Sequence, residues 1–386
     1  MRYRKLGKTN LDVSVLGFGA MRLPMAGNPG GLASFDPNIP IDEVEAMKII
    51  NHALEHGVNY FDTAYGYHAG KSETFLGKAL KQQRTKVMIT TKLPLWNVEK
   101  TEDLEKIFNE QLARLDTDYL DFYLVHGLAA ATWVKAKDLG VLKFLDGLRS
   151  GGQIRYAGFS FHDDLKTFKE IIDAYDWDMC QIQYNFYDQN YQAGKEGLAY
   201  AAIRGIGVVV MEPLRGGKLV DKIPPEIQSL WDSLPAKRSP VEWAMRWVWN
   251  HEQVSTALTG ASSLAQLQDH TRIVKDAEAD SLTAEELSLF DKVQAAYRKM
   301  LKVDCTGCGY CMPCPNCVDI PRNFQLYNDT FLFKDPEFNV FFYNHFLTPD
   351  QRASGCYDCL LCMEKCPQKI NIPEELKAVH KQLGEK

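Results

Sequence analysis

Short apolar runs rich in Val, Ile and aromatic residues recur over roughly the first 260 residues, and amphipathic helical patterns lie between several of them. The runs are VSVLGFG near residue 15, VNYFD to Asp62, KVMITTK to Lys92, LDFYLVH to His126, IRYAGFS to Ser160, MCQIQYN to Asn185, GVVVME to Glu212 and STALTG to Gly260. This pattern predicts eight strands. Strands that alternate with helices pair in parallel, and eight such units close a (β/α)8 TIM barrel, an α/β fold. A doubly wound open sheet is the alternative.

Two segments have the clearest helical pattern. KSETFLGKAL begins at Lys71, where Ser72 can cap the helix, and SLTAEELSLFDKVQAAYRKM carries Thr283 and Glu286 in capping-box spacing. The second helix ends shortly before Cys305. We therefore place a domain boundary near residue 302, with a barrel over residues 1–302 and a smaller, mainly helical domain over residues 303–386.

The connection after the first strand of the barrel is long and rich in Gly and Pro. It runs over MAGNPGGLASFDPNIP, from Met25 to Pro40. Loops of this kind border active sites or bind partners, and others are passive surface loops. The sequence leaves both interpretations open.

Composition narrows the class of function. The chain has 386 residues, 45% of them hydrophobic and 24% charged, as in ordinary globular proteins with a core of their own. Its net charge of -6, with both signs mixed along the chain, argues against a nucleic-acid surface and favours a small-molecule substrate. No apolar run suits a signal peptide or a membrane span. We expect a cytoplasmic protein.

Polar residues finish three consecutive strands of the predicted barrel. They are Asp62, Lys92 and His126, and Tyr67 follows five residues after Asp62. Taken singly, each has an ordinary structural explanation: Asp caps helices, Lys is solvated, and His is often a satisfied core residue. Because active sites of such barrels lie at the carboxyl ends of the strands, the combination favours catalysis.

The chemistry that suits this set is proton donation to a carbonyl that receives a hydride. A neighbouring ammonium stabilises a phenolate, so Lys92 is expected to bring the pKa of Tyr67 closer to neutral. Asp62 would keep Lys92 charged and oriented. His126 would hydrogen-bond the substrate oxygen or share the proton.

The residues up to about 300 resemble the aldo-keto reductase family. The resemblance rests on FDTAYGYHAGKSETFLGKAL, ITTKL, LDFYLVHG, GFSFHD, CQIQYN, VMEPLRGGKL and LTGASSLAQL. It implies that Asp62, Tyr67, Lys92 and His126 are a catalytic tetrad and that the barrel binds NAD(H) or NADP(H). The family does so without a Gly-rich dinucleotide fingerprint, and this chain has none.

The resemblance also implies a set of residues that bind the cofactor: Met21, Ser160, Gln181, Met211, Leu214, Gly216, Gly260, Ser262 and Gln266. Several positions depart from the family. Phe161 replaces a common asparagine, and Met211 replaces an aromatic residue that stacks on the nicotinamide, leaving a sulfur contact. Gly260 and Gln266 stand where a Lys and an Arg often bind the 2′-phosphate, so NADPH preference is in doubt. Arg215 and Lys218 could compensate.

Nine of the ten cysteines fall between Cys305 and Cys366. In a reducing compartment such crowding indicates metal binding, not disulfides. The second run, CYDCLLCMEKCP, fits the C-x2-C-x2-C-x3-C-P pattern of a ferredoxin 4Fe–4S cluster. The tenth, Cys180, is interpreted as a buried apolar residue. We predict two 4Fe–4S clusters, with the ligands Cys305, Cys308, Cys311, Cys314, Cys356, Cys359, Cys362 and Cys366.

The resemblance to two-cluster ferredoxins implies crossed ligation, because there the fourth cysteine of each run binds the other cluster. Cys366 would join the first run and Cys314 the second. The first run is one residue short before Cys314, and Cys317 follows where such modules usually have glycine, so Cys317 is a competing ligand. Two structural zinc sites are the alternative to clusters. The aromatic segment from Phe324 to Phe346 is expected to be a helical insert that packs over the clusters and the barrel.

These expectations together describe an oxidoreductase that interconverts a carbonyl and an alcohol with a nicotinamide. The clusters are then structural, serve a redox protein partner, or work with a cofactor that the sequence does not reveal, since no flavin motif is visible. The alternative is an electron-transfer or docking subunit whose barrel is catalytically silent.

Overall fold

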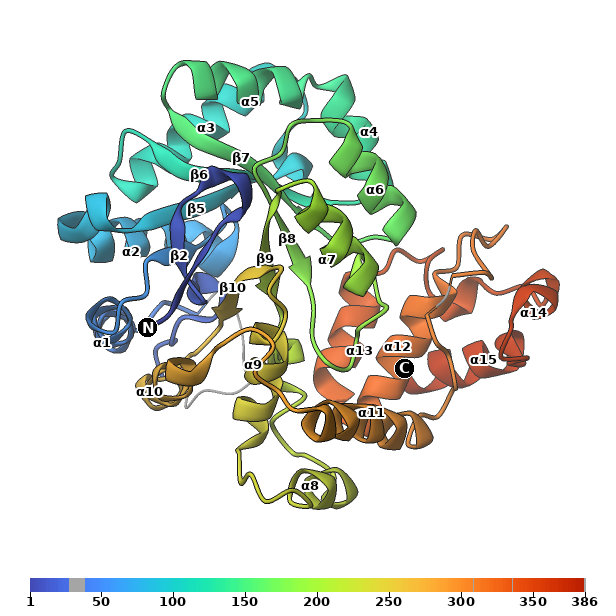
Figure 1. Ribbon diagram of the computed structural model, residues 1–386. Helices are drawn as coiled ribbons and strands as arrows, with labels where there is room; N and C mark the ends of the chain where they lie inside the picture. The colour runs from blue at the N-terminus through green and yellow to red at the C-terminus, as the bar shows by residue number, and fades with distance from the viewer. Residues whose placement is uncertain (28–38, 308, 335, 385–386) are drawn as a thin grey trace. The chain divides into compact units, whose positions relative to one another are not determined.

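The computed structural model describes residues 1–27, 39–307, 309–334 and 336–384 (Figure 1). The chain divides into two compact units, which are described separately. The barrel unit comprises Met1–Leu219 and Arg238–Thr283, and the cysteine unit comprises Val220–Lys237 and Ala284–Lys386. The domain boundary near residue 302 stays a prediction. Most of the Gly/Pro-rich loop lies outside the described residues.

Eight parallel strands close into a barrel in the order β10-β3-β4-β5-β6-β7-β8-β9. The eight predicted strands and the TIM barrel are therefore confirmed, and the open sheet is wrong. The strands are β3 (Leu16–Gly19), β4 (Tyr60–Asp62), β5 (Met88–Leu93), β6 (Leu120–Leu128), β7 (Ile154–Phe161), β8 (Met179–Gln183), β9 (Gly207–Met211) and β10 (Val254–Thr259).

Helices surround the strands of the barrel unit (Figure 1). They are α1 (Glu43–Glu55), α2 (Lys71–Leu80), α3 (Glu102–Leu115), α4 (Ala130–Asp138), α5 (Val141–Ser150), α6 (Leu165–Asp173), α7 (Gly194–Ile203), α9 (Pro240–Trp249) and α10 (Leu264–Ile273).

Helix α2 differs from the expectation at its start. Gly70 is its N-cap, so Ser72 lies inside the first turn and does not cap the helix. The Ser72 hydroxyl donates instead to the carbonyl of Ala20, at 3.0 Å. Gly77 permits close packing against α3, because a Cβ there would lie 2.6 Å from the backbone of Leu115. The predicted capping box at Thr283 stays a prediction.

A two-stranded antiparallel hairpin precedes the barrel. It consists of β1 (Tyr3–Lys5) and β2 (Asp12–Ser14). Leu6 and Val13 from this hairpin pack in one buried cluster with interior barrel residues such as Tyr60 and Phe122. The hairpin thus fills the amino-terminal side of the interior, which leaves the carboxyl ends of the strands for a site.

The cysteine unit is mainly helical, as predicted. Its helices are α8 (Pro225–Trp231), α11 (Ala284–Lys299), α12 (Ile320–Leu332), α13 (Pro336–His345), α14 (Leu361–Lys365) and α15 (Ile372–Leu383). Phe324 and Tyr343 of the aromatic segment are buried in the core of this unit, whereas Phe341 and Phe346 are exposed. None of the helices in the described part of the chain is both long and apolar enough to cross a membrane.

Candidate functional site

The four predicted catalytic residues lie at or just beyond the carboxyl ends of three adjacent strands. Asp62 is the last residue of β4, Lys92 is the penultimate residue of β5, and His126 lies near the end of β6. Tyr67 opens the short helical segment η4 (Tyr67–Gly70), between β4 and α2. The three strands are neighbours in the barrel, so the fold gathers these side chains at one rim.

Lys92 and Asp62 form a buried ion pair. The Lys92 Nζ lies 2.6 Å from Asp62 Oδ1 and donates to the Thr63 carbonyl at 2.7 Å, and both charged side chains are almost completely buried. Burial lowers the pKa of Lys92, but Asp62 and Tyr67 outweigh burial and leave that pKa above its ordinary value. Burial raises the pKa of Asp62, opposed by Lys92 and by a hydrogen bond from Gln181. Lys92 is therefore an ammonium with a fixed orientation.

Tyr67 stands between this ammonium and His126. The Lys92 Nζ is 5.0 Å from the centroid of the Tyr67 ring, and the rings of Tyr67 and His126 meet edge to face with centroids 6.1 Å apart. Burial raises the pKa of Tyr67, and the opposing effect of Lys92 is smaller. The expected shift toward neutral pH is thus wrong for the protein without ligand: desolvation of the phenolate outweighs the neighbouring charge.

His126 is uncharged near neutral pH. Burial lowers its pKa well below the ordinary value, and the nearby positive charge of Lys92 lowers it further. The Nδ1 of His126 is buried and has no hydrogen-bond partner among the described residues. The Trp96 ring packs 4.8 Å from the imidazole, between centroids, and its side chain is exposed.

A buried polar network holds the strand that carries Lys92. Glu73 of α2 accepts hydrogen bonds from Thr91 at 2.6 Å, from Gln111 at 2.7 Å and from Arg114 at 3.1 Å. Gln111 also donates to the Lys92 carbonyl at 3.1 Å. Three donors thus converge on Glu73, and Gln111 holds the backbone of Lys92 from behind the site.

The loop that carries Tyr67 has an unusual backbone. His68 and Ala69 both have positive φ, 50° and 52°, a conformation that non-glycine residues rarely adopt. His68 is buried, and its Nε2 accepts the backbone N–H of Leu23 at 3.1 Å. This bond ties the Tyr67 loop to the segment after η2 (Ala20–Arg22), which contains Met21.

The predicted cofactor residues lie on or after the other five strands, from β7 round to β3. Ser160 and Gln181 are paired in register on β7 and β8, and both are buried. The Gln181 Nε2 donates to Asp62 Oδ2 at 3.3 Å, whereas its Oε1 is buried with no hydrogen-bond partner in the described part of the chain. Met211 ends β9. Phe161 packs on Phe168 of α6, 5.0 Å between centroids, so its ring is directed to the helix layer.

Two loops complete this half of the rim. After β9, Leu214 leads into Gly216, whose φ is 67°. After β10, Gly260 is followed by Ser262, whose backbone N–H and hydroxyl both donate to Gln266 Oε1. Because β9, β10 and β3 are adjacent, these loops and Met21 lie in one sector of the barrel rim, which we call the cofactor sector.

Two cations in this sector differ from the expectation: Arg22 was not among the expected cofactor residues, whereas Arg215 was expected to contact the 2′-phosphate. The Arg22 guanidinium donates to the Gly216 carbonyl at 3.4 Å, and its Cδ lies 3.9 Å from the Cβ position of Gly260. The position of Arg22 directly after Met21, a predicted cofactor residue, was the signal in the sequence that could have identified it. Arg215, by contrast, is buried in an ion pair with Asp188 at 2.9 Å, so its charge is already compensated.

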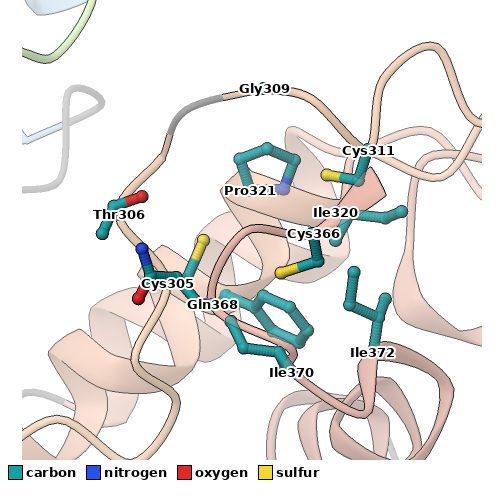
Figure 2. Close-up of a pocket in the computed structure, with 11 residues that line it drawn as sticks. Cys305, Thr306, Gly309, Cys311, Ile320, Pro321, Cys366, Gln368, Ile370 and Ile372 are labelled. Carbon is teal, nitrogen blue, oxygen red and sulfur yellow. The ribbon is translucent and has the colours of Figure 1, made fainter. Parts of the chain in front are cut away.

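In the cysteine unit, three predicted ligands line one pocket. Figure 2 shows the sulfur atoms of Cys305, Cys311 and Cys366 around a common space, although Cys366 belongs to the second run. The remaining lining is mainly apolar: Ile320, Pro321, Phe324, Ile370 and Ile372, with Thr306, Gly309 and Gln368. Cys308 lies outside the described residues.

The thiols of the other group also come from both runs. Burial raises the pKa of Cys356, and the nearby Cys314 and Cys359 raise it further, while Cys362 interacts in the same way with Cys356, Cys359 and Cys314. Cys317 is exposed. Among the described residues, no group of three or more His, Cys, Asp or Glu is placed to hold a single metal ion. Cys180 is completely buried, as predicted.

Comparison with known families decides the identity of the barrel. Residues 15–295 match the model of the Aldo/keto reductase family. The chain belongs to the aldo/keto reductase family. Residues 304–372 match the model of a 4Fe-4S dicluster domain. This aldo/keto reductase is therefore an iron–sulfur protein, and iron–sulfur clusters are favoured over structural zinc sites.

Individual relatives agree with this assignment. L-galactose dehydrogenase of Arabidopsis thaliana is 27% identical over 74% of the chain and 92% of its own length. NADH-specific methylglyoxal reductase of Escherichia coli is 29% identical over 58% of the chain and 70% of its own length. An aldo-keto reductase of Bacillus halodurans, solved in its holo form, superposes with a TM-score of 0.62 at 30% identity, covering 76% of this chain and 96% of that one.

Proposed function

We propose that this aldo/keto reductase reduces a small carbonyl compound to its alcohol with a nicotinamide dinucleotide and with Tyr67 as the proton donor. The observation that carries the proposal is the buried Lys92–Asp62 ion pair, which lies beside Tyr67 while the uncharged His126 faces the same ring. Few arrangements other than acid–base catalysis place an ammonium, a phenol and an imidazole together in a half-buried site.

The residues present suit a nicotinamide. The unpartnered Gln181 Oε1 is a buried acceptor of the kind that a carboxamide N–H would satisfy, and Ser160 lies beside it. Leu214, Gly216, Gly260, Ser262 and Gln266 would hold the rest of the dinucleotide, with Met21 and Met211 beside the ring. When bound, the cofactor supplies the hydride.

Proton transfer then depends on the residues of this chain. The Tyr67 hydroxyl gives its proton to the carbonyl oxygen as negative charge develops there. Lys92 stabilises the phenolate that remains, and Asp62 keeps Lys92 oriented. His126, being neutral, offers a hydrogen bond to the same oxygen. Burial raises the pKa of Tyr67, so the hydroxyl is protonated at neutral pH, the form that donates a proton in carbonyl reduction.

We further propose that NADH binds at least as well as NADPH. Gly260 and Gln266 offer no charge to a 2′-phosphate, and Arg215 is held by Asp188. The NADH-specific relative from Escherichia coli agrees with this expectation. Arg22 is the cation that could oppose it, because its side chain approaches both Gly216 and Gly260.

For residues 303–386 we propose two 4Fe–4S clusters with crossed ligands. Cys366 beside Cys305 and Cys311, and Cys314 beside Cys356, are what crossing requires. The first cluster would take Cys305, Cys308, Cys311 and Cys366, and the second Cys314, Cys356, Cys359 and Cys362.

Nicotinamide binding tests the proposal directly. NADH fluorescence is titrated against anaerobically purified protein, and NADH oxidation is then followed with a panel of small aldehydes and ketones. We expect saturable binding and turnover of at least one carbonyl class. Binding without turnover across the panel would favour the alternative of a silent barrel that serves as an electron-transfer or docking subunit. No binding of either dinucleotide would refute the proposed function.

A further inference from the structure

Two asparagines of helix α12 each bind the backbone that leads into one of the two cysteine runs. Asn323 and Asn328 are both buried, and α12 lies between the runs in the sequence. We propose that Asn328 positions the first run and Asn323 the second, so that one helix sets the two ligand groups in place for cluster assembly. The inference deepens the two-cluster ligation proposed above and rests on it.

Asn328 holds the segment directly before Cys305. Its Oδ1 accepts the backbone N–H of Lys302 at 3.0 Å and that of Val303 at 2.9 Å, and its Nδ2 donates to the Val303 carbonyl at 2.8 Å. The same carbonyl accepts the N–H of Cys305 at 2.8 Å. Asn328 thus binds both backbone polar groups of Val303, and Val303 in turn binds the amide of the first predicted ligand.

Asn323 holds the segment before Cys356 in a similar way. Its Oδ1 accepts the N–H of Ala353 at 2.9 Å, and its Nδ2 donates to the Gln351 carbonyl at 2.8 Å. The Ala353 carbonyl accepts the N–H of Cys356 at 3.2 Å. The Gln351 carbonyl also accepts the N–H of Asp319, the N-cap of α12, at 3.0 Å, so the start of the helix adds to the same contact.

The two contacts lie on different sides of one helix. Asn323 and Asn328 are five residues apart and therefore project about 140° apart around the axis of α12. The residues that they bind, Val303 and Ala353, are buried in one apolar cluster with Phe324. Backbone groups inside such a cluster need partners from the protein, because water does not reach them. The two side-chain amides supply these partners just before the first cysteine of each run.

Positioning of this kind acts on cluster assembly. A 4Fe–4S cluster binds thiolates from separate parts of the chain, so ordering those parts costs conformational entropy that the metal–ligand bonds must offset. Segments that are already fixed beside Cys305 and Cys356 reduce this cost. With crossed ligation, Asn328 serves the first group, which is Cys305, Cys308, Cys311 and Cys366. Asn323 serves the second group, which is Cys314, Cys356, Cys359 and Cys362. Loss of one asparagine should weaken one group and spare the other.

Alkylation of the full chain, purified anaerobically, tests this residue by residue. An iron chelator is added together with iodoacetamide, and mass spectrometry identifies the cysteines that become alkylated as a cluster is lost. Asn328→Ala should label the first group about 10- to 100-fold faster than the parent, because buried backbone groups lose their partner. Asn323→Ala should do the same for the second group. EPR of the reduced protein should show the loss of a different cluster signal in each variant.

Asn344→Ala is the matched control. The Asn344 Nδ2 donates to the carbonyls of Val340 and Leu383, both at 2.8 Å, and neither residue leads into a cysteine. Its loss should therefore label neither group faster. If an alanine variant does not fold, Asn323→Asp and Asn328→Asp keep the size and the acceptor and lose the donor. These variants should weaken the same groups as the alanine variants.

The pattern of labelling separates the positioning role from the ligation. Equal labelling of both groups in the Asn323 and Asn328 variants, or parental rates in all of them, would overturn the positioning role and leave the ligation standing. Selective release of Cys305 and Cys311 together with Cys314 would support the positioning role and refute crossed ligation. A parent with about four irons would refute the two-cluster ligation itself, and the inference with it.

Discussion

Replacing Tyr67 with Phe tests the catalytic assignment with the smallest change to the protein. The substitution keeps the ring that meets His126 edge to face, with centroids 6.1 Å apart, and removes only the hydroxyl. Lys92 keeps its ion pair with Asp62 at 2.6 Å, so no buried charge loses its partner. We expect the free energy of unfolding to change by no more than about 1 kcal/mol, as for loss of one ordinary hydrogen bond.

The rate should respond far more strongly than the stability. A positioned general acid contributes about 10²- to 10⁴-fold to such a step, or about 3–5 kcal/mol of activation free energy. Because Tyr67 acts only as the proton moves, the loss should appear in kcat, while NADH binding, measured by fluorescence, stays within about twofold. Lys92→Met should lower kcat similarly but is a poorer test, since it leaves Asp62 buried without its cation, at a cost of about 3–5 kcal/mol.

The pH profile provides a second readout of the same assignment. Burial raises the pKa of Tyr67 and lowers that of His126, so neither residue changes its charge near neutral pH. Carbonyl reduction should therefore be nearly flat with pH around neutrality and fall only in the alkaline range, as Tyr67 loses its proton. The alkaline limb should disappear in Tyr67→Phe. Near-normal turnover in this variant, with its fold and NADH binding intact, would refute the role of Tyr67.

Four further measurements follow from the structure. Dinucleotide titration should show NADH binding at least as tightly as NADPH; a clear NADPH preference would contradict this, and its loss in Arg22→Met would identify the residue responsible. Anaerobic protein should contain about eight irons per chain, and EPR should show that Cys314→Ser damages the cluster of Cys356, Cys359 and Cys362 while Cys317→Ser leaves both clusters intact; damage in Cys317→Ser would transfer the ligand role to Cys317. Glu73→Ala removes the acceptor of the buried donors of Thr91 and Gln111 and should lower the free energy of unfolding, measured in urea, by about 2–4 kcal/mol. Glu73→Gln should lower it less, and equal losses in the two variants would argue against the network. NADH alone should leave the cluster absorbance of the isolated protein unbleached, and rapid bleaching would contradict the separation of hydride transfer from the clusters.

Periodicity was enough to predict the barrel, because each strand lies in a short, mainly apolar run and helical patterns lie between several of the runs. Asp62, Lys92 and His126 could be chosen on that ground alone, since the topology forces adjacent strand ends together. The capping of α2 could not be predicted. Ser72 has the right type for a cap, but Gly70, with a positive φ, is the N-cap, so the helix begins two residues earlier than a Ser72 cap would allow and the Ser72 hydroxyl donates to Ala20.

Properties that depend on desolvation were also beyond the sequence. Lys92 beside Tyr67 correctly indicated which groups interact, yet the sign of the Tyr67 shift depends on burial, which no motif reports. The same limit applies to the basic residues near the cofactor sector. Arg22 and Arg215 look equivalent along the chain, but Arg215 has a buried carboxylate partner, whereas the Arg22 guanidinium reaches the Gly216 carbonyl of the cofactor sector.

The two parts of the chain handle electrons in different numbers. The hydride transfer proposed for the barrel would move two electrons together, whereas each proposed cluster would accept one, and the sequence shows no flavin motif to convert between them. Direct exchange between a nicotinamide and the clusters is therefore unfavourable. The proposed function therefore leaves the clusters to exchange single electrons with a one-electron carrier, in a step separate from proton donation by Tyr67.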